Sequence, residues 1–356
     1  MGGASLAAIE GDIMKEYKVA IIGFGNVGQG FANILKSKSA VLSETFGVEV
    51  KIVAICDLFL GSIADEDGLK IDSVMAHLSS HSNLKQYPSP QAGWTAIETI
   101  DKSRADILVE LAYTDLKTGE PAYSHIKQAL NNRMHVSMTN KGPVALFYPE
   151  LRDIANKNGV KIGIEGTVMS GTPALTLGQE SLLAAGISKI EGIFNGTTNY
   201  ILGEMEQGMD FDAALKQAQE LGYAEAEPSG DVDGHDAAAK VVILANLMMG
   251  TSLTLDDVSY GGISKITAQD IKAAREAKKH WKLLGKVECR VGEVHASVQL
   301  TMIDGEHPLA NVGGATNAIT YSTELLGDVT LIGAGAGRLE TGYAVLEDIL
   351  NIHRSH

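Results

Sequence analysis

A glycine turn between a short apolar run and a helical pattern is the feature that most constrains this fold. Residues 18–23 read KVAIIG, an apolar run that predicts a buried parallel strand. A helical pattern follows the turn and continues to about residue 36. Gly23 permits the tight turn, Gly25 admits a pyrophosphate, and Gly28 lets the helix pack closely on the strand. The pattern predicts a dinucleotide site formed by Gly23, Phe24, Gly25, Asn26, Val27 and Gly28.

An acidic residue follows the next predicted strand, at 48–56. Asp57 is placed to accept hydrogen bonds from a ribose hydroxyl, which favours NAD over NADP. A solvated aspartate at a strand end is the alternative. Asp57 follows Gly28 at more than the usual ~20 residues, and we expect a loop at 39–46 to account for the difference. No arginine adjoins Asp57 to hold a 2′-phosphate, but Lys36 or Lys38 could, so the choice between NAD and NADP stays open.

Strands and helices alternate along the first part of the chain. Further strands are expected at 106–110, 134–138 and 160–164, and helices at 121–132 and 148–158. This order predicts an α/β fold with a Rossmann-like, doubly wound parallel sheet. From 165 to 320, strands at 187–195 and 295–302 and helices at 172–185, 211–221 and 236–249 predict a second domain of α+β type.

The expected organisation has four segments. They are an N-terminal extension at 1–16, the dinucleotide-binding domain at 17–147, the second domain at 148–325, and a C-terminal segment at 326–356. The last segment has a glycine turn at 333–337 and a helix at 341–352, and it is expected to return to the first domain. A helix and a strand at 148–164 are expected to carry the chain out of that domain.

Charge and cysteine content exclude several classes of protein. The chain has 44 acidic and 29 basic residues and a formal charge of −15, which disfavours nucleic acid and acidic membranes as partners. Two cysteines among 356 residues cannot form a disulfide framework or a cysteine-rich zinc module. We see no secretory signal and no apolar stretch long enough to cross a bilayer. A cytoplasmic protein is expected.

The densest polar cluster lies at 222–240, with the sequence GYAEAEPSGDVDGHDAAAK. Asp236 and Lys240 are four residues apart, so they share one helical face. Lys240 precedes the apolar run VVILANLMM, and a lysine that enters a buried helix needs a partner. Held by a carboxylate, it could donate a proton to a carbonyl oxygen during hydride transfer. A purely structural salt bridge between the two residues explains the pattern equally well.

Two further segments carry candidate site residues. Lys141 and Thr114 follow predicted strands, where this architecture binds ligands, although Lys141 could equally be a surface-loop lysine. The turn EGTVMSGTP at 165–173 has exposed carbonyls beside Glu165 and could bind a hard cation such as sodium, but ordinary loops look similar. The chain has no HExxH motif and no GxSxG elbow, and HxxxH occurs once, as HLSSH at 77–81. Both cysteines are expected to be small core residues.

Together these motifs resemble the homoserine dehydrogenase family over residues 17–352. The TGEPA and TNKGP forms are similar to a short, archaeal-type branch, which is expected to lack a regulatory ACT domain and a fused aspartate kinase. The matching stretches are GFGNVG at 23–28, TGEPAYSHIKQAL at 118–130, TNKGPVAL at 139–146, EGTVMSGTP at 165–173, NGTTNYIL at 195–202, the acidic stretch at 222–240, and GAGAGRLETGYAVLEDIL at 333–350.

The resemblance implies an NAD(P)-dependent oxidoreductase that reversibly reduces L-aspartate 4-semialdehyde to L-homoserine, in threonine, methionine and isoleucine biosynthesis. Lys240 matches the catalytic proton donor, and Asp236 matches its partner, which positions the substrate. Glu225 and Asp231 match residues that bind the amino-acid portion of homoserine. Lys141 matches a lysine near both cofactor and substrate. The second domain is then the substrate-binding, catalytic and dimerisation domain of a homodimer.

The same resemblance implies a sodium site and completes the cofactor site. The sodium loop matches Glu165, Val168, Ser170 and Thr172, although Ser170 stands where glycine or alanine is usual and Thr172 where an aliphatic residue is usual. Thr114 and Gly335 join the cofactor-binding set. Many relatives carry an arginine at the end of the second strand for the NADP phosphate, whereas residues 55–59 here read ICDLF.

Two other functions compete with this interpretation. Aspartate-semialdehyde dehydrogenase chemistry would need a thiolate near a histidine, and neither Cys56 nor Cys289 has that context. A non-catalytic nucleotide sensor would keep the glycine turn, but it would have no reason to keep Asp236 and Lys240 beside a strongly acidic loop.

Overall fold

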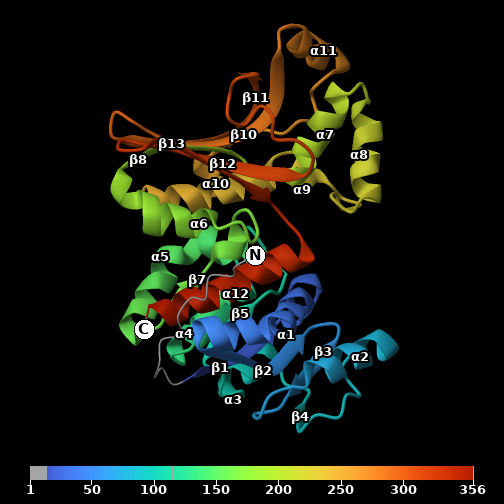
Figure 1. Ribbon diagram of the computed structural model, residues 1–356, viewed down its shortest axis with the longest axis vertical. Helices are drawn as coiled ribbons and strands as arrows, with labels where there is room; N and C mark the ends of the chain where they lie inside the picture. Colours follow the sequence, from blue (N-terminus) through green and yellow to red (C-terminus); the bar gives the residue numbers. More distant parts are fainter. Residues whose placement is uncertain (1–13, 114, 356) are drawn as a thin grey trace, which may run out of the picture. The chain divides into compact units, whose positions relative to one another are not determined.

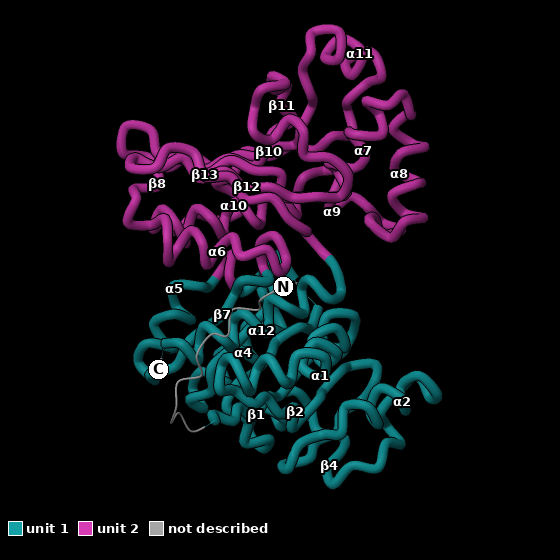
Figure 2. Tube along the Cα trace, viewed as in Figure 1, with its two compact units in different colours: residues 1–143, 147–166, 337–356 teal, residues 144–146, 167–336 magenta. Residues whose placement is uncertain are grey.

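The computed structural model describes residues 14–113 and 115–355. They form two compact units, drawn in teal and magenta in Figure 2. The first unit holds the described residues of 1–143, 147–166 and 337–356, and the second holds 144–146 and 167–336. Most of the N-terminal extension predicted at 1–16 lies outside the described residues.

A seven-stranded sheet forms the centre of the first unit, with strand order β4-β3-β2-β1-β5-β6-β7. Strands β2, β1, β5, β6 and β7 are parallel, while β3 and β4 extend one edge in antiparallel fashion. The predicted doubly wound α/β fold is therefore confirmed, with an antiparallel edge that the sequence analysis missed. The strands are β1 (Lys15–Ile22), β2 (Val48–Asp57), β3 (Gly61–Ala64), β4 (Gln91–Ala92), β5 (Ile107–Glu110), β6 (His135–Met138) and β7 (Ile162–Gly163).

Helices connect most of these strands along the chain, and the C-terminal helix joins them (Figure 1). The C-terminal helix α12 packs against α1 at two glycines. A Cβ on Gly30 would lie 2.1 Å from the backbone oxygen of Arg338, and one on Gly342 would lie 2.6 Å from the nitrogen of Phe31. The helices are α1 (Asn26–Phe46), α2 (Ile71–His81), α3 (Ala96–Lys102), α4 (Ala122–Asn131), α5 (Lys141–Asn158) and α12 (Arg338–Arg354), with a 3-10 turn η1 (Glu165–Thr167).

The loop expected at 39–46 is wrong, because α1 continues through it to Phe46. Leu42 is buried seven residues after the buried Leu35, so this part of the chain extends the apolar stripe of the helix. Gly47, at φ +65°, then ends the helix and donates its N–H to the oxygen of Leu42. The extra spacing between Gly28 and Asp57 is therefore helical.

The units separate at 166 and rejoin at 336, whereas the sequence analysis placed boundaries at 147 and 325. Helix α5 begins at Lys141 rather than at 148, and β7 pairs with β6. Residues 148–164 therefore complete the first sheet instead of leaving it. At the other end, residues 327–334 form β13, which pairs with β12 of the second unit.

The second unit has a six-stranded sheet in the order β13-β12-β8-β10-β11-β9. Neighbouring strands are antiparallel, except for the parallel pair β9 and β11. This mixed arrangement confirms the predicted α+β class, although β9, β10, β12 and β13 were not predicted. The strands are β8 (Ile187–Ile193), β9 (Ser259–Tyr260), β10 (Lys279–Arg290), β11 (Glu293–Asp304), β12 (Thr316–Thr323) and β13 (Gly327–Ala334).

Helix α10 is the central helix of the second unit, and it packs against β10 and β11. All of its residues from 237 to 245 are buried, as the apolar run in the sequence indicated. Among the described residues, no helix is both long and apolar enough to span a bilayer. The helical elements are α6 (Ala174–Thr176), η2 (Leu177–Leu182), η3 (Leu183–Ala185), α7 (Gly196–Glu206), α8 (Phe211–Glu220), α9 (Ser229–Val232), α10 (His235–Met248), η4 (Leu255–Asp257) and α11 (Ala268–Glu276).

Candidate active site

The turn between β1 and α1 packs tightly at two of its glycines and is open at the third. Gly23 has φ +90°, and a Cβ there would lie 2.6 Å from the backbone carbonyl of Leu111. A Cβ on Gly28 would lie 2.8 Å from the oxygen of Gly23, but one on Gly25 would meet nothing within 4 Å. Gly25 is also the N-cap of α1 and offers no side chain to its first N–H groups. These groups can therefore bind a phosphate at the helix N-terminus.

Asp57 holds the glycine turn in place. One carboxylate oxygen accepts a hydrogen bond of 2.8 Å from the N–H of Phe24, which is fully buried. The other accepts hydrogen bonds of 2.9 Å from both N–H groups of residues 59–60. Asn26 and Val27 form the first turn of α1 beside it. Asp57 is thus more than a solvated strand-end residue, because it joins the end of β2 to the turn.

Glu110, the last residue of β5, connects the loops that follow β5 and β6. Its buried carboxylate accepts hydrogen bonds from the N–H of Ala112 at 2.8 Å and from Nδ2 of Asn140 at 3.2 Å. Its other oxygen lies 2.8 Å from Nδ1 of His125. Asn140 is the N-cap of α5, so Glu110 fixes the position from which Lys141 projects.

Lys141 is the first residue of α5 and is half-buried, so it does not belong to a surface loop. The chain after β5 lies against this helix start, because a Cβ on Gly142 would be 2.3 Å from the oxygen of Asp115. Thr114, predicted in the same loop, lies outside the described residues. The first unit therefore gathers the glycine turn, Asp57 and the start of α5 at the carboxyl ends of parallel strands, where ligands bind in this architecture.

In the second unit, the acidic stretch folds into α9, a glycine turn and α10. Lys240 is only 6% exposed, and its Nζ lies 2.6 Å from Oδ2 of Asp236 and 2.6 Å from the oxygen of Phe194. An ammonium group has three protons, and these contacts use two of them. The i,i+4 pair predicted from the sequence therefore exists, and it is buried on the lysine side.

Asn195 links this ion pair to a second carboxylate. Its Nδ2 donates hydrogen bonds to Oδ1 of Asp231 at 2.7 Å and to Oδ2 of Asp236 at 3.1 Å. Its Oδ1 caps α7 by accepting from the N–H of Thr198 at 2.9 Å. Thr197 completes the set, because its hydroxyl shares one proton between the oxygen of Tyr223 at 2.7 Å and Oδ2 of Asp231 at 3.0 Å.

Burial raises the pKa of Asp231, and the nearby charge of Asp236 raises it further. Hydrogen bonds from Asn195 and Thr197 and the charge of Lys240 oppose these effects without cancelling them. A carboxylate whose charge is disfavoured in this way gains from a cationic ligand. The cluster can therefore hold an ammonium group at Asp231 and offer a proton at Lys240.

Sequence reasoning missed Asn195 and Thr197 as site residues, although the stretch NGTTNYIL was noted. An asparagine directly before a helix is an N-cap signal, but its contacts to residues 36 and 41 positions later leave no local trace. Glu225 is exposed in the loop before α9, where its backbone oxygen accepts from Nε2 of Gln219 at 3.0 Å.

The predicted sodium loop is divided between the units, with Glu165 in the first and the other three residues in the second. Glu165 and Ser170 are buried, Val168 is fully buried, and the hydroxyl of Thr172 donates to the oxygen of Ala334 at 3.1 Å. Ser170 has φ +57°, a left-handed conformation that favours glycine. No three His, Cys, Asp or Glu side chains in the described part of the chain gather into a metal-binding group. The sodium site stays a prediction.

Gly335, predicted in the cofactor set, lies in the second unit after β13. A Cβ there would lie 2.2 Å from Cγ of Asn317, which is completely buried. The side-chain oxygen and nitrogen of Asn317 have no hydrogen-bond partner among the described residues. The observed reason for glycine at 335 is therefore this close approach to an amide, and its role towards a cofactor stays a prediction.

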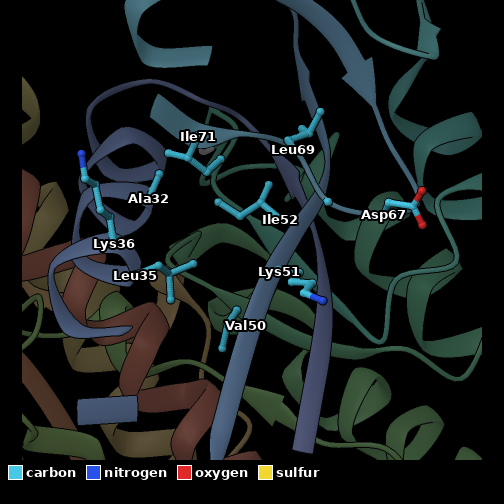
Figure 3. A pocket seen from close by; sticks show the side chains of 10 residues that line it. Ala32, Leu35, Lys36, Val50, Lys51, Ile52, Asp67, Leu69 and Ile71 are labelled. Atoms are coloured by element: carbon cyan, nitrogen blue, oxygen red, sulfur yellow. The ribbon is translucent and has the colours of Figure 1, made fainter. Parts of the chain in front are cut away.

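The first unit also has a hollow of about 290 Å³ that does not include the glycine turn, Asp57 or Lys141 (Figure 3). Residues of α1, β2 and the segment 67–71 line it, among them Lys36, Lys51 and Asp67. None of the predicted site residues lines this hollow. Lys36, considered above as a 2′-phosphate ligand, is instead 2.5 Å from the carboxylate of Asp72.

Comparisons with known proteins agree with one another. The family model for homoserine dehydrogenase matches residues 173–350. A second model, for glutamate, leucine, phenylalanine and valine dehydrogenases, matches residues 3–131. An NAD(+)-dependent homoserine dehydrogenase of Pseudomonas canavaninivorans is 43% identical over 96% of this chain and 97% of its own length. A homoserine dehydrogenase of Methanocaldococcus jannaschii is 39% identical, over 95% and 98% respectively.

Solved structures point to the same family. A putative homoserine dehydrogenase of Archaeoglobus fulgidus aligns with a TM-score of 0.84 at 34% identity, over 95% of this chain and 99% of its own. A hyperthermophilic archaeal homoserine dehydrogenase in complex with NADPH aligns with a TM-score of 0.82 at 29% identity, over 96% and 99%.

Proposed function

This chain belongs to the homoserine dehydrogenase family, and on that premise we propose how its own residues carry out the NAD(P)-dependent interconversion of L-homoserine and L-aspartate 4-semialdehyde. The observation that carries the proposal is the buried ammonium of Lys240, 2.6 Å from both Asp236 and the oxygen of Phe194. Lys240 is the proton donor to the aldehyde oxygen, and it recovers the proton in the reverse direction.

Asp236 and the Phe194 carbonyl hold two of the three ammonium protons, so the third is left for the substrate oxygen. Asp236 is a positioning residue for Lys240, since it fixes the nitrogen and compensates its charge in a buried setting. The charge of Lys240 also stabilises negative charge that develops on the substrate oxygen before proton transfer.

Asp231 binds the substrate ammonium in this proposal. Its two oxygens accept one hydrogen bond each from Asn195 and Thr197, while a carboxylate has about four acceptor sites. Its raised pKa supports this role, because an incoming cation favours the charged form. Glu225, on an exposed loop, is proposed as a second ligand of the same ammonium.

When bound, NAD(P) would accept or supply the hydride. The residues of the first unit fit such a cofactor: Gly25 leaves open space beside an uncapped helix start, and Asp57 stands at the end of β2. We propose that Asp57 accepts from a ribose hydroxyl and that the chain prefers NAD, since a 2′-phosphate would meet the carboxylate. Lys141, Thr114 and Gly335 are proposed to complete the cofactor site.

Three further properties are part of the proposal. Sodium would bind at 165–172, where the left-handed Ser170 redirects the backbone carbonyls. A homodimer would form through the second unit, whose edge strand β13 and its preceding turn expose Leu325, Leu326 and Ile332. Two free cysteines are compatible with a cytoplasmic protein.

The thiol-dependent alternative has little support. Burial raises the pKa of the Cys56 thiol, which works against a thiolate nucleophile. The expectation that both cysteines are core residues holds for Cys56 but is wrong for Cys289, which is exposed at the end of β10. A nucleotide sensor would not need Lys240, so the decisive experiment concerns that residue.

The proposal is tested by measuring homoserine oxidation with NAD and with NADP, through the absorbance of the reduced nicotinamide. Lys240→Ala is expected to lower kcat at least about 100-fold, the low end for a lost general acid. Lys216→Ala is the matched control, because Lys216 forms an exposed i,i+4 pair with Glu220 on α8. Wild-type turnover in Lys240→Ala would remove the lysine from the mechanism, and no oxidation by the wild-type protein with either cofactor would favour the sensor.

A further inference from the structure

A basic hollow of about 390 Å³ lies in the second unit, among α7, the end of α11, the start of β10 and the loop at 310–314. Four lysine and arginine side chains line it against two glutamates, Glu204 and Glu206. This local excess of positive charge stands out in a chain with a net charge of −15. The cationic residues are Arg275, Lys278, Lys279 and Lys282, with His280 between them.

Lys282 is a buried cation held only by neutral groups. It is 3% exposed, and its Nζ donates to Oδ1 of Asn199 at 3.0 Å and to the oxygen of Val312 at 2.6 Å. No carboxylate in the described part of the chain forms an ion pair with it. Burial lowers its pKa, and the charge of Glu206 only partly opposes this. With one proton left uncommitted, the ammonium gains from an anion in the hollow.

Arg275 and Lys278 stand exposed at the end of α11 and just beyond it. In residues 14–113 and 115–355, neither side chain has a hydrogen bond or an ion pair. Two of their neighbours are already engaged, because Lys279 pairs with Asp304 at 3.1 Å and His280 with Glu206 at 3.0 Å. Two exposed side chains, with five and three donors respectively, are therefore available to a ligand in the hollow.

The loop at 310–314 contributes backbone donors. Nδ2 of Asn199 holds the carbonyls of Val312 at 3.1 Å, Gly314 at 3.0 Å and Thr316 at 3.2 Å. The N–H groups of Gly313 and Gly314 have no acceptor among the described residues, and both glycines line the hollow. Glycine N–H groups without a Cβ nearby are well suited to an anion.

We propose that this hollow binds a small dianionic oxyanion, a phosphate group either free or carried by a small organic molecule. Lys282 supplies the buried positive charge at the base, and the loop glycines supply N–H donors. Arg275 adds the planar fork that binds two phosphate oxygens at once, and Lys278 adds a further exposed positive charge. Arg275, Lys278 and Lys282 line the hollow without an ion pair to a carboxylate among the described residues, and three such charges suit a dianion.

Isothermal titration of the full chain tests the site, with inorganic phosphate in one arm and glycerol 3-phosphate in the other, at constant ionic strength in chloride. We expect saturable binding to a single site. The double variant Arg275→Ala/Lys278→Ala should weaken it at least about tenfold, the loss expected for one charged hydrogen bond, and should keep wild-type kcat. Lys272→Ala is the matched control, since Lys272 lies on α11 outside the hollow and faces Glu276.

The two arms separate the sources of the phosphate group. Tighter binding of glycerol 3-phosphate indicates an organic phosphate, and equal or weaker binding indicates free phosphate. Lys282→Met, checked for folding by circular dichroism, should abolish binding in either case. The proposal is overturned if neither probe binds saturably, or if the double variant binds phosphate as tightly as the wild type.

Discussion

Replacing Asn195 by alanine tests how far the site depends on an uncharged residue. Asn195 caps α7 and donates hydrogen bonds to Asp231 and Asp236. Loss of an N-cap costs about 1 kcal/mol, and a hydrogen bond to a charged group contributes about 1.5–3 kcal/mol. Counting the cap and the shorter of the two hydrogen bonds, the one to Asp231, we expect the free energy of unfolding to fall by roughly 2.5–4 kcal/mol.

The helix cap alone can be measured at α8. Asp210 is its N-cap and accepts a hydrogen bond of 2.8 Å from the N–H of Ala213, away from the carboxylate cluster. Asp210→Ala should therefore cost only about 1 kcal/mol in urea unfolding. The difference between the two variants measures what Asn195 contributes beyond its cap.

Activity separates the two roles further. Asn195→Ala should lower kcat/KM for homoserine at least about tenfold, the equivalent of 1.4 kcal/mol. The hydrogen bond from Asn195 lowers the pKa of Asp231, so its loss raises that pKa and moves the acidic limb of the kcat/KM profile to higher pH. Asn195→Asp keeps the acceptor that caps α7 but places a third carboxylate beside Asp231 and Asp236. We therefore expect it to lower kcat/KM by a larger free-energy equivalent than it lowers the free energy of unfolding.

The reasoning is refuted if Asn195→Ala and Asp210→Ala lose the same free energy of unfolding while Asn195→Ala keeps wild-type kcat/KM and pH profile. Asn195 would then be a helix cap and nothing more.

Three other predictions address the cofactor, the packing of α12 and acid stability. Asp57→Ser should lower the ratio of kcat/KM for NAD to that for NADP about tenfold, the effect of one hydrogen bond to a charged group, while Asp65→Ser, in an exposed turn, should leave it unchanged. Gly30→Ala, whose Cβ would lie 2.1 Å from a backbone oxygen of α12, should lower the free energy of unfolding by about 1–3 kcal/mol, whereas Gly203→Ala, in open space within α7, should raise it by roughly 0.5–1 kcal/mol. Burial raises the pKa of Glu191, but the charges and hydrogen bonds of two neighbouring lysines outweigh burial and hold this pKa below the ordinary 4.5. The charged form of Glu191 therefore stabilises the fold above about pH 4.5, and this stabilisation is lost as the pH falls. Glu191→Gln should remove this contribution to the pH dependence of the free energy of unfolding, measured in urea.

Local patterns were sufficient for the elements that hold the predicted site. The run KVAIIG and the turn after it predicted β1, the glycine turn and the start of α1, since strand, turn and helix signals follow one another directly. The spacing of Asp236 and Lys240 likewise predicted an ion pair within one helix. Each of these features depends on neighbours no more than a few residues away.

Contacts between distant residues were not predictable in this way. Glu110 depends on Asn140, thirty residues later, and Lys282 contacts Asn199, which precedes it by 83 residues. Glu110 ends an otherwise apolar strand, whereas Lys282 is one of several charged residues in β10, and only the fold reveals which groups surround each of them. The length of α1 was missed for another reason, because three serines and one lysine at 37–43 hid the buried Leu42.

The second unit contains two buried lysines, and only one of them has a carboxylate partner. This difference in charge compensation suits the two lysines to different functions. Lys240 has the carboxylate of Asp236 at 2.6 Å, so its charge is compensated and an additional anion there would gain little. Lys282 has only an amide and a carbonyl, and burial lowers its pKa. A proton donor needs the first arrangement, because the lysine must stay charged until the substrate oxygen takes its proton. An anion site needs the second, because the incoming charge supplies the compensation that the protein withholds. To exchange the two functions, a carboxylate would have to be removed from beside Lys240 and introduced beside Lys282, while both lysines could stay where they are.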